Sequence, residues 1–590
     1  MQLDVKHPAI EEVFKDFYEV PQFQREYVWK TEQVEALLAD AQEALFDENG
    51  SPTQSEYFIG SIVAYKDEDV FQLIDGQQRI TTLFICLCAF RERRKDLGDQ
   101  ESLQFLEAMI RDQYQKMDGT TGLRLRLKPL YEDAGEVLQN LALSEVAAQT
   151  KTLPNSARNM LEAYAAAYEF LEEQFGDDLI KLRTFQAHLT KRVRLVRIQT
   201  GNVSDALRIF ETINDRGVGL NALDLLKNLL FRQTERTQFD QLTGIWKDMV
   251  HTIEKTRKGE KPLRFLRYFV LSRYADARKN GKPITEDDLY DWLSGKQDDI
   301  GISKNPVGYA KSLLEAAQLY RQHVASPGAA LSSIYKFSGR ARQHLIIMLA
   351  TEGLNREELD EVERQLERLF VGFVLTKEPT KALDMIFANA APALRGFIAA
   401  TPASPKRLTA LRDHLQAWVQ PEIAKRLTRI EAALDTLSLE RKTATRFVLS
   451  RLAQHVEKLA GCQVAGIDHY WSYHIEHVLP NQPTQEQLGQ FDKPEQYGHF
   501  KQRLGNLTLL EQSINCAIGR DYFADKQPHY QKSALFMTKS LTQSQAVGTG
   551  SAFAKAAALL PTFSVWNSTS IETRQQQLKQ LALDAWGFHA

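Results

Sequence analysis

The stretch His474-Ile-Glu476-His477-Val-Leu-Pro480 constrains the fold and chemistry of this 590-residue chain more than any other. It sets an acid directly before a histidine, with a further histidine two residues ahead of the acid. Two asparagines follow, Asn506 in the word Leu504-Gly-Asn-Leu-Thr-Leu-Leu510 and then Asn515. The run Asn506–Leu510 is strand-like, and residues 474–477 could also form a strand.

The order acid-His, then Asn, then Asn suits phosphodiester cleavage with one metal ion, as in His-Asn-His nucleases. Neutral imidazole is a suitable base for activating water, because its unperturbed pKa is about 6.5. Mg²⁺ (or Mn²⁺) prefers oxygen ligands, few of them from protein. We therefore assign His477 as the general base, with Glu476 and Asn515 as metal ligands. The Asn506 side chain could hold the loop that carries His477, and His474 could be a further ligand or support one.

Two alternatives to a nuclease site remain open from spacing alone. A His-x-x-His pair is common among ordinary polar and core residues. Zinc is the other alternative, but Cys462 and Cys516 are isolated and the sequence has no Cys-x-x-Cys pair. Neighbouring residues of a strand point to opposite faces, so a bend at Val478-Leu-Pro480 would be needed to bring Glu476 and His477 to one site.

The N-terminal third contains a strand-to-helix turn at Asp75-Gly76-Gln77-Gln78-Arg79. Residues 57–65 and 70–74 predict a β-hairpin that leads into this turn, and apolar residues recur at helical spacing after it. The free N–H groups at a helix start bind anions, and Arg79 could add a bidentate phosphate contact. The alternative is an ordinary turn in which Asp75 caps the helix and Arg79 lies in solvent.

A third polar sequence motif, Phe210-Glu-Thr-Ile-Asn214-Asp-Arg216-Gly217, lies where one expected helix ends and before the next begins. Residues 203–213 predict a short amphipathic helix, and a second helix is expected to begin after Asn221. Arg216 could reach a phosphate, or it could pair with Asp215 or Glu211. The sequence has no Gly-x-x-x-x-Gly-Lys-Ser/Thr word, which excludes a Walker-type nucleotide site.

These sequence motifs together resemble those of the GmrSD-like type IV modification-dependent restriction enzymes. The resemblance rests on 474–480, 504–510, Asn515, Phe523, Lys526, Tyr530 and Ser533 near the C-terminus, and on 20–29, 75–79 and 210–228 near the N-terminus. It implies an N-terminal domain related to the ParB and sulfiredoxin fold that binds a nucleoside triphosphate, ATP or GTP, with NTPase activity. The residues implied to bind the nucleotide are Gln24, Arg25, Tyr27, Asp75, Gly76, Gln77, Gln78, Arg79, Asn214 and Arg216.

Composition is that of a globular protein without a membrane span. Hydrophobic residues make up 43% and charged residues 25%, and no apolar run approaches the ~20 residues of a membrane helix. Four cysteines and no secretory signal favour the cytoplasm. The net charge is −3, so DNA binding would need local basic surfaces. The candidates are 191–197 and 406–429, with solvated faces as the alternative.

The chain is expected to be mixed α/β and mostly α-helical, with three parts. Residues 1–235 would be the ParB/sulfiredoxin-like nucleotide-binding and DNA-sensing domain, 236–430 a helical connector, and 431–590 a ββα-metal (HNH) nuclease domain. The segment 355–370, for example, has acids in its first turn and an apolar stripe at helical spacing.

Three functions follow as hypotheses. The first is a nucleotide-controlled endonuclease that cuts double-stranded modified phage DNA, such as glucosylated hydroxymethylcytosine DNA, as BREX-associated BrxU-type proteins of this architecture would. The second is a phosphorothioate-sensing nicking nuclease of the SspE type. The third is a nucleotide-gated DNA-binding protein whose nuclease site is vestigial. A double-strand break needs two nicks, which makes a homodimer plausible.

Overall fold

The computed structural model describes residues 3–22, 24, 26–47, 49, 51–99, 103–115, 121–130, 134–145, 153–214, 222–257, 259–337, 341–542 and 551–589. Helices dominate these ranges and strands form one small mixed sheet and three two-stranded ribbons, which confirms the expected mixed α/β, mostly helical class. Within the described ranges, no helix is both long enough and apolar enough to cross a membrane.

The chain divides into two compact units, with boundaries inside helix α10 (Phe239–Glu254), between Asp288 and Leu289, and inside helix α13 (Pro306–Ala325). Unit 1 comprises Met1–Asp248 and Leu289–Leu314, and unit 2 comprises Met249–Asp288 and Glu315–Ala590. The expected connector, 236–430, is thus shared between the two units. The division into three domains stays a prediction.

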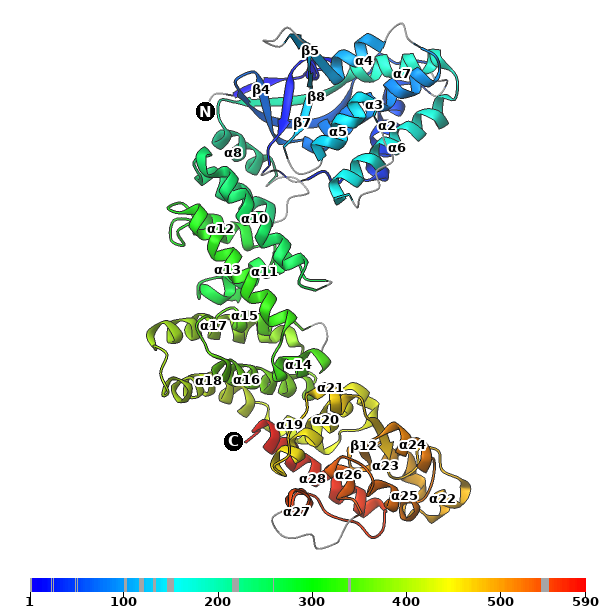
Figure 1. Cartoon of the computed structure of the whole chain (residues 1–590), viewed down its shortest axis with the longest axis vertical. Coiled ribbons are helices and arrows are strands. Elements are labelled where there is room, and N and C mark those ends of the chain that lie inside the picture. The colour runs from blue at the N-terminus through cyan, green and yellow to red at the C-terminus, as the bar shows by residue number, and fades with distance from the viewer. Residues whose placement is uncertain are drawn as a thin grey trace. The chain divides into compact units, whose positions relative to one another are not determined.

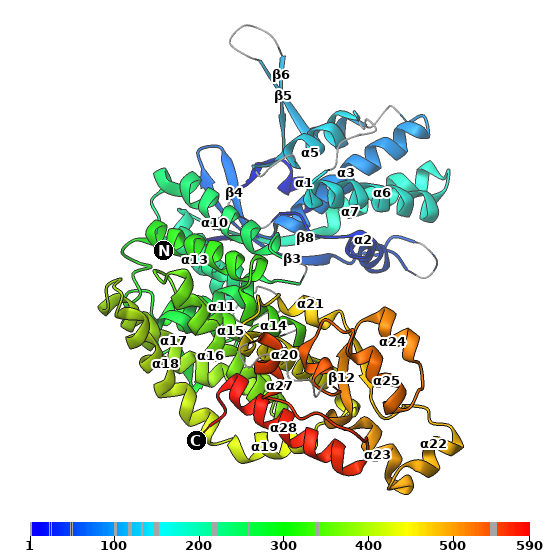
Figure 2. The ribbon, with the colours of Figure 1, turned by 60° about the horizontal axis from the view of Figure 1, so that its bottom comes forward.

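Unit 1 is built on a six-stranded sheet in the order β1-β8-β3-β4-β2-β7. The expected hairpin is present, since β3 and β4 pair antiparallel, while β8 runs parallel to β3 and β2 lies parallel to both β4 and β7. The strands are β1 (Leu3–Lys6), β2 (Phe17–Val20), β3 (Tyr57–Asp67), β4 (Val70–Asp75), β7 (Leu127–Pro129) and β8 (Val193–Thr200). A separate ribbon of β5 (Arg111–Gln115) and β6 (Thr121–Leu125) projects from this unit (Figure 2).

Helix α3 (Gln77–Asp96) begins at the turn that the sequence predicted and lies deep in the core of unit 1 (Figure 1). Its middle, residues 83–90, is wholly apolar and buried, while polar and charged residues occupy both of its ends. The other helices wholly in unit 1 are α1 (Ile10–Val13), α2 (Thr31–Leu45), α4 (Leu103–Ile110), α5 (Ala134–Leu143), α6 (Asn155–Phe175), α7 (Leu179–Arg192), α8 (Val203–Asn214), α9 (Ala222–Gln233) and α12 (Leu289–Gly295).

Unit 2 begins with helical layers and ends in a small ββα arrangement. Its first helices are α11 (Pro262–Arg273), α14 (Ala329–Phe337), α15 (His344–Met348), α16 (Arg356–Leu375), α17 (Leu383–Ala400), α18 (Arg407–Ala424), α19 (Leu427–Asp435), α20 (Lys442–Leu459) and α21 (Ile467–Trp471), with a ribbon of β9 (Arg278–Lys279) and β10 (Lys282–Pro283). Helix α16 confirms the prediction for 355–370, because Asn355 caps it and pairs reciprocally with Glu358.

The predicted strand pair forms between β11 (His474–His477) and β12 (Leu507–Leu510), which run antiparallel. Residues Leu504–Asn506 form a short 3-10 turn into β12, and α24 (Gln512–Ile518) follows it. The remaining helices are α22 (Gln485–Gln490), α23 (Tyr497–Gln502), α25 (Phe523–Tyr530), α26 (Phe536–Lys539), α27 (Ala552–Ala557) and α28 (Ser568–Trp586).

Glycine is required at position 505 of this turn. A Cβ there would collide with the Ile571 carbonyl oxygen of α28 and lie 2.9 Å from the Gln575 backbone nitrogen. The Gly505 N–H donates to Gln575 Oε1 at 2.6 Å, and its carbonyl accepts from Arg574 Nη1 at 2.9 Å. The turn Leu504–Asn506 is therefore held against helix α28 by close packing and hydrogen bonds.

Candidate nuclease site and nucleotide cavity

His477, the expected general base, ends strand β11 and is half-buried. Burial, together with the positive charges of Lys526 and Lys501, lowers the pKa of His477 to about 4. Its Nε2 is shielded from solvent and makes no hydrogen bond with any described residue. At neutral pH the ring is therefore uncharged and has a nitrogen available for a proton.

Asn506 holds the loop that follows His477. Its Oδ1 accepts from the Leu479 N–H at 2.7 Å and from Trp566 Nε1 at 2.8 Å. Its Nδ2 donates to the carbonyls of Leu479 at 3.1 Å and Lys501 at 2.9 Å. The side chain is fully buried, so Asn506 acts through the backbone as a positioning residue, as one reading of the sequence had it.

Glu476 forms a buried ion pair with Lys526, which the sequence analysis did not predict. Its Oε1 accepts from Lys526 Nζ at 2.7 Å and from the Tyr530 hydroxyl at 2.9 Å, and the residue is only 5% exposed. Lys526 Nζ also donates to the His477 carbonyl at 2.8 Å. Lys526 and Tyr530 lie four residues apart on α25, so both face the strand. That helical spacing was the available signal.

His474 and Asn515 come together as the sequence predicted for parts of one site. Asn515 Nδ2 lies 3.4 Å from His474 Nδ1, and Asn515 Oδ1 is buried without a partner among the described residues. Exchanging the amide oxygen and nitrogen of Asn515 would set two acceptors next to each other, as a cation requires. No group of three or more His, Cys, Asp or Glu with metal-binding geometry occurs in the described ranges.

The turn at Asp75–Arg79 lines a cavity of about 170 Å³ in unit 1, hereafter the turn cavity. Gly76 adopts φ +77°, and a Cβ there would come within 2.5 Å of Ile62 Cγ2 and 2.9 Å of the Ser61 carbonyl oxygen. Only glycine fits this position. The cavity is lined by Gln24, Trp29, Ile74, Asp75, Gly76, Gln77, Gln78, Arg79, Phe210, Asp224, Lys227 and Asn228.

Several residues assigned to the nucleotide also hold the fold together. Gln78 Oε1 accepts from the Val28 N–H at 2.9 Å, and Arg79 Nη1 donates to the Ser61 carbonyl at 3.0 Å. Asp75 Oδ1 accepts from the Gly76 N–H at 2.7 Å, and burial raises the pKa of Asp75. The turn is thus well ordered before any ligand binds.

The structure corrects the placement of Tyr27. Its ring is buried in the core and its hydroxyl bonds Thr82 Oγ1 at 2.8 Å, so it does not line the turn cavity. Arg25 and Arg216 lie outside the described residues. Asn214 ends helix α8, and its side chain likewise lies outside what the structure describes.

Gln24 and Lys227 contribute buried polar groups to the turn cavity. Gln24 is 6% exposed, and its Nε2 has no partner among the described residues. Burial lowers the pKa of Lys227 to about 8, and its Nζ lies 3.4 Å from the Gln24 carbonyl oxygen. Lys227 and Asn228 were missed as site residues. The signal was their spacing from Asp224, which puts all three on one face of α9.

The sequence left open whether the two basic runs are DNA-binding surfaces or solvated faces, and in the structure several of their arginines are paired. Arg192 ends helix α7, and Arg197 is buried against Asp16 and Tyr18. In the second run the arginines pair with acids of α16 and the turn after it. The pairs are Arg407–Glu358, Arg426–Glu378 and Arg429–Glu378.

Unit 2 thus has an acid and a neutral histidine on a strand pair that is followed by a helix, and unit 1 has a separate polar cavity. Residues 10–231 match the N-terminal domain of the GmrSD restriction endonuclease, and residues 425–581 match the C-terminal domain of GmrSD restriction endonucleases. The chain belongs to the GmrSD-like type IV restriction enzymes, so it is a modification-dependent restriction nuclease whose substrate is DNA. A comparison with curated proteins gave no match.

Proposed function

We propose that this nuclease cuts double-stranded modified phage DNA, such as glucosylated hydroxymethylcytosine DNA, with an HNH-type site under the control of a nucleoside triphosphate. The main support for the proposed nuclease site is the state of the His477 side chain. Its ring is neutral, its Nε2 is unpaired, and Asn506 holds the backbone that follows it. A general base needs these three properties.

In this proposal His477 takes a proton from the water that attacks the phosphodiester. Lys526 fixes the end of strand β11, because its Nζ donates hydrogen bonds both to the His477 carbonyl and to the Glu476 carboxylate. Lys501, whose Nζ donates to the Asn481 carbonyl at 3.0 Å, adds a positive charge near the histidine. Burial is the main cause of the lowered pKa of His477, the two lysines add to it, and they would also place positive charge close to a DNA phosphate.

The cation would be Mg²⁺ or Mn²⁺, held by His474 and Asn515 together with water and phosphate oxygens. The Asn515 amide lies 3.4 Å from His474 Nδ1, and with its oxygen and nitrogen exchanged the two side chains would offer adjacent acceptors to the cation. Glu476 remains a ligand only through Oε2, because Lys526 and Tyr530 bond its Oε1. When bound, the cation would offset the negative charge that develops on the phosphate and on the leaving oxygen.

The nucleotide would bind at the turn cavity, with its phosphates at the N-terminus of α3. The helix start, the Gln24 amide and the Lys227 ammonium all face this cavity. A volume of about 170 Å³ is below the usual range of roughly 300–1,000 Å³ for ligand pockets, so the described walls enclose part of the nucleotide. Hydrolysis of this nucleotide and dimerisation for double-strand cutting belong to the same proposal.

A DNA panel tests the proposal. Plasmids or duplexes carrying glucosylated, hydroxymethylated, phosphorothioated or unmodified DNA are incubated with Mg²⁺ or EDTA, with and without ATP or GTP. We expect Mg²⁺-dependent cutting of base-modified DNA whose rate changes with nucleotide. Stimulation by phosphorothioated DNA alone would replace the proposed substrate with a modified backbone, and equal cutting in EDTA would remove the cation.

A further inference from the structure

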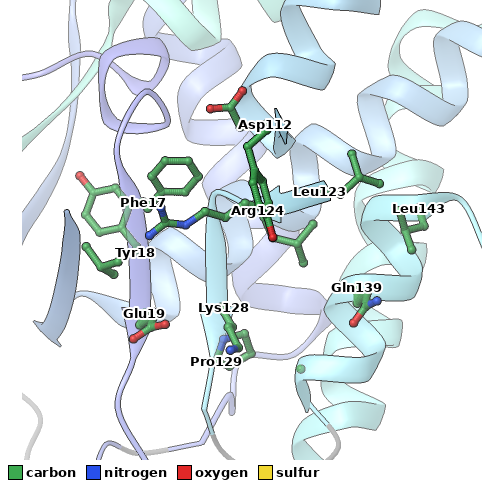
Figure 3. A pocket seen from close by; sticks show the side chains of 14 residues that line it. Phe17, Tyr18, Glu19, Asp112, Leu123, Arg124, Lys128, Pro129, Gln139 and Leu143 are labelled. Atoms are coloured by element: carbon green, nitrogen blue, oxygen red, sulfur yellow. The ribbon is translucent and has the colours of Figure 1, made fainter. Parts of the chain in front are cut away.

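Unit 1 contains a second, larger cavity of about 780 Å³, hereafter the edge cavity. Strands β2 and β7 at the sheet edge form its floor, and the β5–β6 ribbon and α5 form its walls (Figure 3). It shares no lining residue with the turn cavity. Its volume is within the usual range for a ligand pocket of roughly 300–1,000 Å³.

One wall of the edge cavity is held by stacked guanidinium groups. The Cζ atoms of Arg124 and Arg126 lie 3.8 Å and 4.4 Å from the centroid of the Phe17 ring. Arg124 also pairs with Asp69, and Arg126 Nη1 donates to the Lys15 carbonyl at 2.8 Å. These contacts fix the β6–β7 segment against β2, so the cavity is formed before a ligand arrives.

The ribbon presents an aromatic ring at the mouth of this cavity. Tyr114 on β5 is 50% exposed although it is a large aromatic residue. Its ring lies across Gly122 on β6, where a Cβ would come within 2.5 Å of Tyr114 Cζ. The glycine therefore allows the ring to lie flat on the ribbon. Such a ring offers a face on which a planar base or the apolar face of a sugar can stack.

The charges in the edge cavity favour a neutral, polar ligand. Arg124 pairs with Asp69 and Asp112 pairs with Arg126, and the remaining charged lining residues, Glu19 and Lys128, are of opposite sign. A triphosphate would need an excess of positive charge, so it does not fit here. Gln139 lines the opposite wall with an exposed amide that makes no side-chain hydrogen bond with described residues. Amides and carboxylates of this kind bind hydroxyl groups.

We propose that the edge cavity receives the modified base, turned out of the duplex, with Tyr114 stacked on it and Gln139 and Asp112 bonded to the hydroxyl groups of its sugar. This inference rests on the proposed function and names the site that reads the modification. Turning a base out of the stack costs a few kcal/mol, and stacking on an aromatic ring offsets part of that cost. A hexose on the 5-position of a pyrimidine has the neutral, polar character that the cavity requires.

The test uses the full chain and a duplex with one glucosylated hydroxymethylcytosine next to 2-aminopurine. Fluorescence of 2-aminopurine reports base extrusion, and a binding titration gives the affinity for the glucosylated duplex. We expect Tyr114→Ala and Gln139→Ala to weaken binding by about tenfold each. Tyr114→Ala should also abolish the fluorescence rise. Affinity for unmodified duplex and for ATP should not change.

Phe105→Ala is the matched control, because Phe105 is an aromatic residue that is 74% exposed and does not line the edge cavity. Circular dichroism checks that each variant is folded. If the wild type prefers glucosylated DNA and the Tyr114 and Gln139 variants keep that preference, the edge cavity is not the reader. No fluorescence rise in the wild type would equally overturn base extrusion. A wild type without any preference for modified DNA would instead contradict the proposed function.

Discussion

The turn cavity and the nuclease site are each built around a short contiguous sequence motif. The two motifs differ in whether their neighbouring side chains reach the same site. All five residues of Asp75–Arg79 line one cavity, because a turn into a helix start directs successive groups toward one point. Glu476 and His477 are neighbours on a strand, where successive side chains diverge. The acid points to Lys526 and Tyr530, and the histidine lies at the strand end. Neighbouring residues in a motif therefore share a site only when the local backbone allows it.

The largest effect should come from removing the cation that balances Glu476. Lys526→Met leaves a buried, unpaired carboxylate, which costs about 3–5 kcal/mol of stability. Hydrogen exchange of the β11 and β12 amides measures this loss within unit 2. The double variant Glu476→Gln with Lys526→Met should recover much of it, because neither charge then remains buried. A single variant as stable as the wild type would mean that Glu476 is balanced in another way.

A smaller effect is expected at the glycine of the turn cavity. Gly76→Ala combines left-handed strain of about 1–2 kcal/mol with overpacking against Ile62 and Ser61 of about 1–3 kcal/mol. Gly98 is a matched control, since it has φ +73° and nothing within 4 Å of a Cβ. Thermal unfolding should therefore show a larger loss for Gly76→Ala than for Gly98→Ala, with weaker ATP binding only in the former. Equal losses would show that the contact with the sheet is unimportant.

The smallest effect is a pH dependence of nucleotide binding. The pKa of Lys227 is lowered to about 8, so the side chain is charged below that pH and becomes neutral above it. An anionic nucleotide should therefore bind more weakly as pH rises past 8, by up to about tenfold per pH unit. Lys227→Arg keeps its charge throughout and should show no such fall. Calorimetric titration of ATP between pH 7 and 9.5 measures both proteins, and parallel curves would exclude Lys227 from the site.

The sequence predicted the elements of both sites but not how their side chains pair. The hairpin, the start of α3 and the β11–β12 pair follow from local patterns of apolar residues and turn residues. The ion pair of Glu476 with Lys526, fifty residues away, depends on tertiary packing and left only a helical spacing in the sequence. Tyr27 shows the same dependence on tertiary packing. It is close to Gln24 in sequence, but its ring is buried in the core and does not line the turn cavity. Arg197, Arg407 and Arg426 likewise pair with acids that are remote in sequence, which the basic runs alone do not reveal.

If His477 cuts DNA while the turn cavity binds the nucleotide, the two functions should separate in one variant. The measurement is cleavage of glucosylated DNA by His477→Ala, together with ATP affinity of the same preparation. Loss of a general base should slow cutting by about 10²–10⁴-fold, while ATP affinity stays that of the wild type. Cutting at the wild-type rate by His477→Ala would contradict the account.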